Sequence, residues 1–434
     1  MLTCFPVTDV VLAQRPTRAI GCWSSRPYND GVRYGIIADD LTGSCDVAGR
    51  LTHLGYRPSV RLRAVGSGAR RSPRDTGSAV VVVNARSRAS SQDGAMALVR
   101  SAAEDLEGAG WSVAYYKMDS TLRGYWPEEL DSLESLLQPA RVLVCPAFPA
   151  RGRFYRGGRL ELRKELREDF RTTLHAGASA SLRHDLKEQL GHFPHHVPLE
   201  VVRRGQQAVR AAVKAAKSRY VVFDATRERD LEVIGKAFRN SEGRILWAGS
   251  AGLVRHVLPR LAEPESGPSP TPERPWLLLQ GSRQRISHEQ FQRLELDDAV
   301  LSIRFQEQSG RKVLRRWYDA AMASLAARQH VAISVPREFG FRLPEEFANF
   351  LQRLFAGIRR ERWLGGIFVS GGSSAEAVCD ALRVTALQVI GEVGPGIARS
   401  VLLDGRWPGL PLITKAGGFG EPDEVREILK EVSS

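Results

Sequence analysis

The chain has 434 residues, a formal net charge of +13 and enough hydrophobic residues, 43%, to fill more than one core. This length exceeds what a single hydrophobic core usually holds, so we expect a globular protein of two domains. The positive charge fits an anionic ligand such as a phosphate or a carboxylate. Because the basic residues are dispersed, without a block of five or six, a nucleic-acid-binding protein is the weaker interpretation.

The five cysteines are widely spaced and include no CxxC pair. We therefore expect neither a disulfide framework nor a thiolate zinc site, and a reducing cytoplasm fits best. No run of about 18 apolar residues is present, so no membrane partner is expected. Residues 1–33 lack a basic start followed by an unbroken apolar core, so we interpret them as a loosely docked N-terminal extension and not as a secretory signal.

From Tyr34 to Leu261, short apolar runs alternate with amphipathic helical stretches. This alternation is typical of a mostly parallel sheet covered by helices. The expected strands span residues 34–38, 59–62, 79–84, 113–117, 142–145, 220–223 and 245–248. The expected helices span residues 89–107, 127–137, 178–190, 230–240 and 251–261.

The first expected strand ends at two adjacent carboxylates, Asp39 and Asp40. In open α/β sheets, ligands bind outside the carboxyl ends of the strands. We expect one of the two acids to face that crevice and the other to cap a helix that begins near Ser44. The alternative is that both are turn and capping residues.

Polar residues also follow three later strands. Arg86 and Arg88 are separated by one residue and could bind an anion through their guanidinium forks, although two solvated loop arginines remain an alternative. Residues 116–124 combine lysine, aspartate, hydroxyl and arginine side chains in one turn, which is dense for a purely structural loop. Residues 145–153 form a turn stiffened by two prolines that carries Arg151 and Arg153; a rigid surface turn is the alternative there.

The composition changes at residues 263–275, which contain five prolines and no apolar anchor. This segment predicts a semi-rigid linker between domains at 34–262 and 276–434. Beyond it, a second α/β series has expected strands at residues 276–280, 300–303, 331–335, 366–370, 387–390 and 412–414. The fold class predicted is therefore α/β, with two domains that are each a mostly parallel sheet with flanking helices.

Three glycine-containing turns follow strands of the second half, at residues 280–283, 370–375 and 414–420, and none matches the Walker pattern. Glycines let backbone amides approach a ligand, and a helix starting at Ser373 or Ser374 would point its positive end at phosphate oxygens. Lys415 would add a point charge, while Gly417 and Gly418 can adopt positive φ. Each turn alone is more simply a tight turn with a serine cap, but three together favour a nucleotide site.

Five segments resemble, in the same order, the four-carbon acid sugar kinase family, whose members phosphorylate erythronate, threonate and oxo-tetronates with ATP. They are IADDLTGSCDVAG, KMDSTLRG, PAFPARGR, GGSSA and TKAGGFG. The similarity runs from about Tyr34 to the C-terminus. It implies an N-terminal domain that binds the acid sugar, a C-terminal domain that binds the nucleotide, and an active site in the cleft between them.

The resemblance also implies roles for individual residues. Those expected to border the sugar acid are Asp39, Asp40, Thr42, Arg86, Arg88, Lys117, Asp119, Arg123 and Arg153. The resemblance places Ser282, Gly371, Gly372, Ser373, Ser374 and Gly417 at the nucleotide, and the 391–396 segment, which contains Glu392, near the same pocket. Lys415 and Gly418 are expected there from the third glycine turn itself.

Three departures from the family pattern matter for function. Ser373 and Ser374 stand where the family commonly has an acidic residue and a threonine, which leaves the handling of Mg²⁺ open. Phe154, Tyr155 and Arg156 replace small hydroxyl residues, and Arg86 replaces a usual lysine. A catalytically weakened homologue that acts as a sugar-acid-binding or regulatory protein is therefore the alternative to an active kinase.

The expected mechanism is in-line transfer of the ATP γ-phosphoryl group to a hydroxyl of the acid sugar, with Mg²⁺ and basic groups neutralising charge. A carboxylate would accept the hydroxyl proton, with Asp40 preferred over Asp39 and Asp119. Arg86 and Arg88 would hold the sugar carboxylate, and closure about residues 263–275 would exclude water. The oligomeric state is open, a homo-oligomer included.

Overall fold

The computed structural model describes residues 33–62, 78–166, 180–239, 243–261, 274–306, 310–336, 345–358 and 364–433. The predicted N-terminal extension and the predicted proline-rich linker lie outside these residues, except for Arg33, Arg274 and Pro275. The hinge expected in that linker and the domain limits at 262 and 276 stay predictions.

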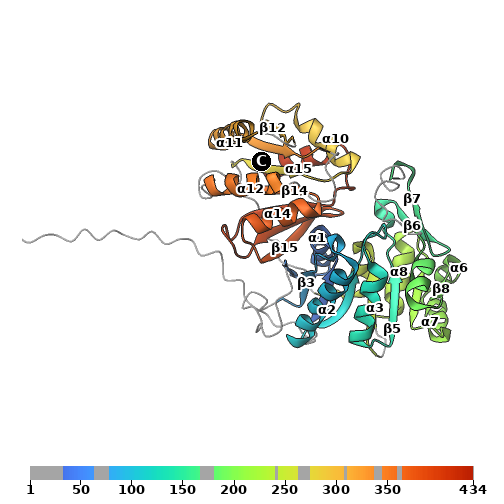
Figure 1. The fold of residues 1–434 in the computed structure, drawn as a ribbon. Helices are drawn as coiled ribbons and strands as arrows, with labels where there is room; N and C mark the ends of the chain where they lie inside the picture. The colour runs from blue at the N-terminus through green and yellow to red at the C-terminus, as the bar shows by residue number, and fades with distance from the viewer. Residues whose placement is uncertain are drawn as a thin grey trace, which may run out of the picture.

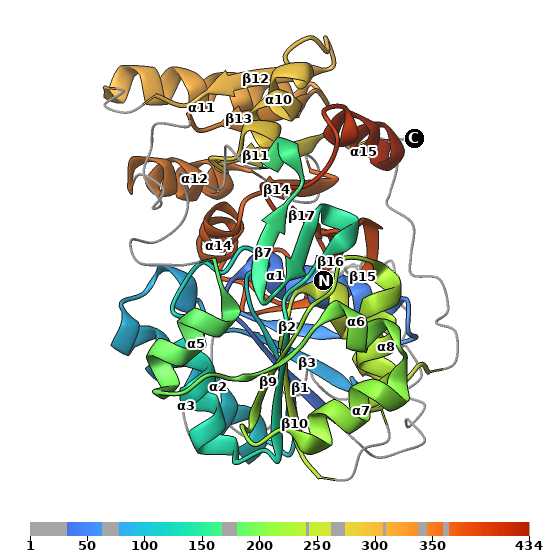
Figure 2. The ribbon, with the colours of Figure 1, turned by 90° about the vertical axis from the view of Figure 1, so that its right-hand side faces the viewer.

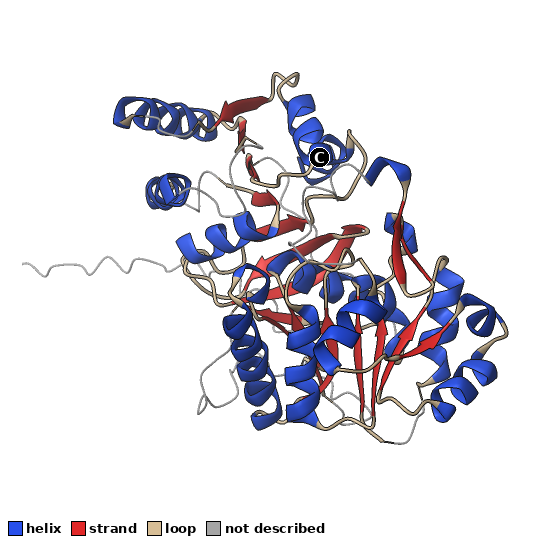
Figure 3. Ribbon diagram, turned by 45° about the vertical axis from the view of Figure 1, so that its right-hand side comes forward, coloured by secondary structure: helices blue, strands red, loops and turns tan. Residues whose placement is uncertain are grey.

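One mixed sheet of fifteen strands runs through the described residues, in the order β12-β13-β11-β14-β17-β16-β15-β2-β3-β1-β4-β10-β5-β9-β8. Its N-terminal part is parallel throughout. Helices lie on both sides of the strands (Figure 3). The predicted α/β class of mostly parallel sheet with flanking helices is confirmed.

The N-terminal half contains the strands β1 (Tyr34–Ala38), β2 (Ser59–Arg61), β3 (Val80–Asn84), β4 (Ser112–Lys117), β5 (Arg141–Cys145), β8 (His195–Val197), β9 (Tyr220–Phe223) and β10 (Ile245–Gly249). Its α-helices are α1 (Leu41–Thr52), α2 (Gln92–Gly108), α3 (Trp126–Leu137), α5 (Leu182–Leu190), α6 (Leu199–Arg203), α7 (Gln206–Ala215), α8 (Glu228–Ala237) and α9 (Ala251–Val257). The central strand β3 is buried over its whole length, because helices cover both faces of a parallel sheet.

A separate hairpin, β6 (Arg153–Arg156) and β7 (Arg159–Leu162), rises from the N-terminal half toward the C-terminal half (Figures 1 and 2). Its turn is held by the buried Asp224 at the end of β9, which accepts hydrogen bonds from the Gly157 and Gly158 amides, both 2.8 Å long. The hairpin is thereby fixed beside the carboxyl ends of the strands.

The C-terminal half contains β11 (Trp276–Gln280), β12 (Val300–Arg304), β13 (His330–Ser334), β14 (Gly366–Ser370), β15 (Ala386–Gly394), β16 (Ile397–Leu402) and β17 (Pro411–Lys415). Its helices are α10 (Arg285–Leu294), α11 (Arg311–Ala326), α12 (Glu345–Gly357), α14 (Gly372–Ala381) and α15 (Glu424–Ser433). Strands β12, β13, β11, β14 and β17 are parallel, while β15 and β16 form an antiparallel pair that extends the sheet.

The two halves are joined through the sheet itself. Strand β15 pairs antiparallel with β2, from Ala386 opposite Arg61 to Gln388 opposite Ser59. Helix α1 packs against β15, β16 and α14, so the first helix of the N-terminal half lies at the junction (Figure 2). The carboxyl ends of β1 and β14 consequently approach each other.

Several local expectations differ from the structure. Helix α1 begins at Leu41 and not near Ser44, with Asp40 as its N-cap, and α14 begins at Gly372 with Gly371 as its N-cap. The sequence reading did not identify β6, β7, β8 and β16. These strands are short or carry many polar residues, so they lack the continuous apolar runs that marked the others.

Candidate active site

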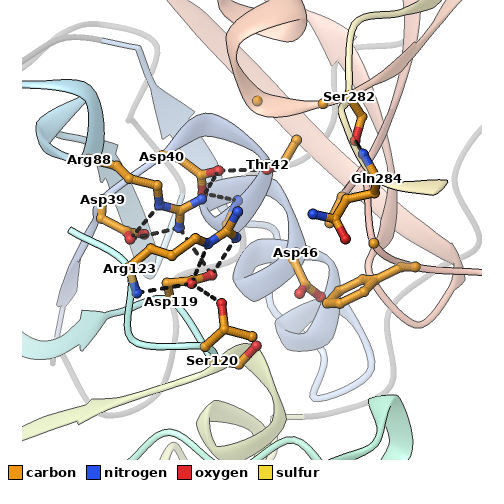
Figure 4. A pocket seen from close by; sticks show the side chains of 18 of the residues that line it. Asp39, Asp40, Thr42, Asp46, Arg88, Asp119, Ser120, Arg123, Ser282 and Gln284 are labelled. Carbon is orange, nitrogen blue, oxygen red and sulfur yellow. Dashed lines mark hydrogen bonds and ion pairs between the residues drawn. The ribbon is translucent and has the colours of Figure 1, made fainter. Parts of the chain in front are cut away.

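A pocket of about 360 Å³ lies between the carboxyl ends of strands from both halves (Figure 4). A side-chain carbon placed on Gly372 of the C-terminal half would come within 2.8 Å of Asp40 Oδ2, so the two walls are close. Most of the predicted site residues line this pocket: Asp39, Asp40, Thr42, Arg86, Arg88, Lys117, Asp119, Arg123, Arg153, Ser282, Gly371, Gly372, Ser373, Gly417 and Gly418.

Arg88 organises the acidic side of the pocket. Its Nε and Nη2 donate to Asp39 Oδ2 at 2.9 and 2.7 Å, and its Nη1 donates to Asp40 Oδ2 at 2.6 Å (Figure 4). Asp119 forms a second pair with Arg123, whose Nε and Nη2 donate at 2.7 and 2.8 Å. Asp39 and Asp40, of which one was expected to face the crevice and the other to cap a helix, therefore share one arginine.

Asp40 has further donors because it caps helix α1. It accepts from the Thr42 hydroxyl at 2.8 Å and from the Gly43 amide at 2.7 Å. Burial alone would raise the pKa of Asp40, but Arg88, Lys117 and these hydrogen bonds leave that pKa below its usual value. Burial likewise opposes ionisation of Asp119, yet Arg123 and Arg88 hold its pKa well below the usual range. For Asp39, burial outweighs Arg88 and raises the pKa.

The opposite wall consists of glycine and serine turns that are tied to one another. The Gly281 amide donates to the Ser370 carbonyl at 3.2 Å, and the Gly371 amide donates to the Lys415 carbonyl at 3.0 Å. Ser287 of α10 lies 2.9 Å from the Ser370 hydroxyl and donates to the Gly417 carbonyl at 2.6 Å. These contacts hold the three turns as one surface.

Two glycines are required by this surface. Gly371 has φ +109°, which side-chain-bearing residues rarely adopt. At Gly417, a Cβ atom would lie 1.8 Å from Ser282 Oγ. The backbone of the third turn thus approaches the first more closely than any other residue type would permit. Backbone amides next to the first turn of α14 suit a phosphate group.

Lys415 does not face the pocket. It is fully buried, and its Nζ donates to the carbonyls of Phe419 and Ala416 at 2.8 and 3.1 Å. Burial lowers the pKa of Lys415 to about 7. The lysine therefore braces the third turn from behind, and does not offer the point charge expected from the sequence.

Two other predicted nucleotide residues also lie off the pocket wall. Ser374 is buried inside α14. Glu392 contacts α1 of the N-terminal half, where it lies 3.2 Å from Arg50 Nε and 3.0 Å from His53 Nε2. The structure thus places Glu392 at the junction of the two halves.

Arg86 lines the pocket, but its fork is occupied across the junction. Its Nη1 and Nη2 donate to the two carboxylate oxygens of Asp380 at 3.0 and 2.9 Å. The nearby Asn84 donates to Glu376 of α14 at 2.9 Å. Arg86 and Arg88 therefore point at different carboxylates, and their two forks do not converge on one ligand.

Arg153 is the contrasting arginine. It is 7% exposed, its Nε has no hydrogen-bond partner, and none of the described acids forms an ion pair with it. Its guanidinium carbon lies 4.7 Å from the ring centre of Phe419, which belongs to the third glycine turn. Burial lowers the pKa of Arg153 to about 10, so the side chain stays cationic at neutral pH.

Sequence reasoning did not identify several polar residues that line the pocket, among them Asp46, Gln284 and Glu376. Asp46 follows Thr42 by four residues and Glu376 follows Ser373 by three, so each shares a helix face with a predicted residue. That spacing was the available signal. Gln284 follows the first glycine turn and had none.

Among the described residues, no group of three or more histidine, cysteine or acidic side chains is arranged to hold a metal ion. In the same part of the chain, no helix is long and apolar enough to cross a membrane.

The comparisons agree with this division into two walls. Residues 34–257 match a family model described as a sugar-binding N-terminal domain, and residues 277–425 match one described as a nucleotide-binding C-terminal domain. Together the two models cover most of the chain.

Curated relatives resemble the chain over nearly its whole length. A D-threonate kinase of Cupriavidus necator is 34% identical over 89% of this chain and 94% of its own. A D-erythronate kinase of Heliobacterium modesticaldum is 28% identical over 89% and 94%, and a 3-oxo-tetronate kinase of Pectobacterium atrosepticum is 26% identical over 93% and 100%.

Solved structures share the fold. A crystal structure from Salmonella typhimurium superposes with a TM-score of 0.74 at 20% identity, over 92% of this chain and 99% of the other. One of a Haemophilus influenzae protein gives a TM-score of 0.66 at 20% identity, over 92% and 100%.

Proposed function

The chain belongs to the four-carbon acid sugar kinase family, and from this membership we propose that it transfers the γ-phosphoryl group of ATP to a hydroxyl of a four-carbon acid sugar. The observation that carries the proposal is the pocket itself. Its one wall offers arginine and lysine side chains for a carboxylate, and its other wall offers backbone amides for phosphates. The two walls are close enough to share a reacting group.

The acid sugar is proposed to bind on the wall formed by the ends of β1, β3 and β4. Arg88, Lys117 and Arg123 supply positive charge there, while Asp39, Asp40 and Asp119 can accept hydrogen bonds from sugar hydroxyls. The ion pairs between these residues fix the side chains before the substrate arrives, which lowers the entropic cost of binding. Arg86, already paired with Asp380, is proposed to tie the two halves together instead.

ATP is proposed to bind against the three glycine turns, with Ser282, Gly371, Gly372, Ser373, Gly417 and Gly418 near its phosphates. Arg153 lies between this wall and the sugar wall, and a Cβ atom on Gly418 would lie 3.3 Å from its Nη2. We propose that Arg153 neutralises charge on the phosphoryl group in transit, because it is a buried arginine of the pocket for which the described residues supply no ion-pair partner.

Mg²⁺ accompanies ATP in phosphoryl transfer and prefers carboxylate, phosphate and water oxygens. Asp40 and Glu376 would hold it, since Asp40 lies beside Gly372 at the start of α14 and Glu376 lies one turn along the same helix. Burial, together with Asp40, raises the pKa of Glu376, as expected for an acid near another negative charge. Glu376 would thereby supply the carboxylate that the family commonly has at the position of Ser373. The bound ion would neutralise phosphate charge.

The test is a coupled ADP-release assay on the full chain with D-threonate, D-erythronate and 3-oxo-tetronate. We expect ADP release that depends on one or more of these acids, and much weaker release by Asp40→Asn and Lys415→Ala variants. Binding of an acid without any ADP release would instead favour a sugar-acid-binding regulator. Salt-sensitive binding to DNA without turnover would favour the nucleic-acid alternative. The cytoplasmic location and the oligomeric state stay predictions.

A further inference from the structure

Asp46 differs from the other acids of the pocket. Among the described residues that line it, Asp39, Asp40, Asp119 and Glu376 each accept a hydrogen bond from a neighbouring side chain. Asp46 accepts none, although its Oδ1 is buried. Its ion pair with Arg50 is long, 3.9 Å from Nε to Oδ1, and the same Nε lies closer to Glu392, at 3.2 Å.

The position of Asp46 is equally specific. It lies on α1 one turn beyond Thr42, with its side chain only 4% exposed. In Figure 4 it stands apart from the network around Arg88 and Arg123, and no dashed contact reaches it. A buried carboxylate without donors is costly unless a ligand satisfies it. Asp46 belongs to the N-terminal half, which is the half proposed to receive the acid sugar, and it lines the same pocket.

We propose that Asp46 is the general base that accepts the proton of the attacking sugar hydroxyl. This inference rests on the proposed kinase function and deepens it. Asp40, the acid favoured by the sequence, is less suited to that role because hydrogen bonds from Arg88, Thr42 and Gly43 stabilise its ionised form and help hold its pKa below the usual value. Asp119 is similarly occupied by Arg123.

The step balances without any reactant beyond ATP and the acid sugar. The hydroxyl oxygen forms a bond to the γ-phosphorus, and its proton moves to the free Asp46 oxygen. The bond between the γ-phosphorus and the β,γ-bridging oxygen breaks, and ADP leaves with that electron pair. Asp46 returns its proton to water when the products depart.

The surroundings of Asp46 tune it for this role. Burial raises the pKa of Asp46 to about 6, an effect that Glu392 strengthens and that Arg50, Lys117 and Arg151 oppose. At neutral pH most of the carboxylate is therefore ionised, yet it binds a proton more tightly than an exposed aspartate does. A base with a pKa near the working pH is the most effective in proton transfer.

The experiment compares full-length wild type with Asp46→Asn in the ADP-release assay, over a range of pH. We expect kcat to fall by about 100-fold or more in the variant, while KM for ATP and for the acid stay within about threefold. The wild-type kcat should fall as the pH drops below about 6, and this limb should be absent from the residual activity of Asp46→Asn. Asp46→Glu should restore part of kcat. Asp93→Asn, an exposed aspartate of α2, is the matched control and should leave kcat unchanged.

A kcat within threefold of wild type in Asp46→Asn would overturn the role, and so would a change confined to KM. If Asp46→Asn does not fold, the pH profile of Asp46→Glu decides: a displaced acid limb supports the proposal and an unchanged one refutes it. Absence of turnover by wild type with every acid would instead refute the proposed function itself, and the role of Asp46 with it.

Discussion

The two walls of the pocket are built from opposite materials. The wall of the N-terminal half is a set of charged side chains at the ends of β1, β3 and β4, fixed in place by ion pairs such as Arg88 with Asp39. The wall of the C-terminal half is mostly backbone, with glycine and serine turns bound to one another. Side chains can distinguish one small acid from another, whereas backbone amides suit a phosphate chain that is the same in every turnover.

This contrast predicts that substitutions on each wall affect different substrates. On the charged wall, a substitution that removes a charge should be more damaging than one that keeps it. The glycine wall should not tolerate an added side chain.

The largest effect is expected from Arg88→Ala. The substitution leaves Asp39 and Asp40 without the arginine they share, so it should lower the free energy of unfolding by about 3–5 kcal/mol. It should also lower kcat/KM for the acid on the order of a thousandfold. Urea unfolding and steady-state kinetics measure the two effects. Arg88→Lys keeps the charge but not the guanidinium fork, so its kcat/KM should lie between those of wild type and Arg88→Ala. A kcat/KM in Arg88→Ala equal to that of wild type would contradict the role of the charged wall.

On the glycine wall, Gly417→Ala should lower kcat/KM for ATP by about 100-fold, because its Cβ would collide with Ser282 and displace the turn. KM for the acid should stay within about twofold. Gly108→Ala is the control, since a Cβ at that end of α2 would meet nothing within 4 Å. Equal losses for both substrates would show that the walls do not act separately.

Lys415→Met tests the brace behind the third turn. Burial lowers the pKa of Lys415 to about 7, so between about pH 7 and pH 10 the unfolded chain binds a proton there that the folded chain does not. The stability contributed by this lysine must therefore rise with pH over that window. The difference in Tm between wild type and Lys415→Met should therefore rise with pH over this window. A difference in Tm that falls with pH would contradict the burial of Lys415.

The smallest effect is expected from Arg86→Ala. The side chain of its partner Asp380 is 42% exposed, and solvent-exposed ion pairs contribute only about 0.2–1 kcal/mol. KM for the acid should change by less than about threefold in steady-state kinetics. A rise of about 100-fold in KM for the acid would instead show that Arg86 binds the sugar carboxylate, as the sequence suggested.

Much of this arrangement was predictable because parallel strands bring their carboxyl ends to one edge. The acids after β1, the polar turn after β4 and the glycine turns after β14 and β17 were each visible as interruptions of apolar runs. Which arginine pairs with which acid was not visible, because Arg86 and Asp380 are nearly 300 residues apart in the chain. The inward direction of Lys415 depends on the backbone carbonyl of Phe419, which accepts a hydrogen bond from its Nζ, and no local pattern encodes this contact. Asp46 had a local signal in its spacing from Thr42.

The most direct test of the account is ³¹P NMR of a reaction that contains the full-length protein, ATP with Mg²⁺ and the preferred four-carbon acid. The account predicts that one new phosphomonoester resonance grows as the γ-phosphate resonance of ATP declines, and that omission of either substrate abolishes it. Growth of inorganic phosphate alone, or an unchanged spectrum with every acid tested, would contradict phosphoryl transfer between the two walls.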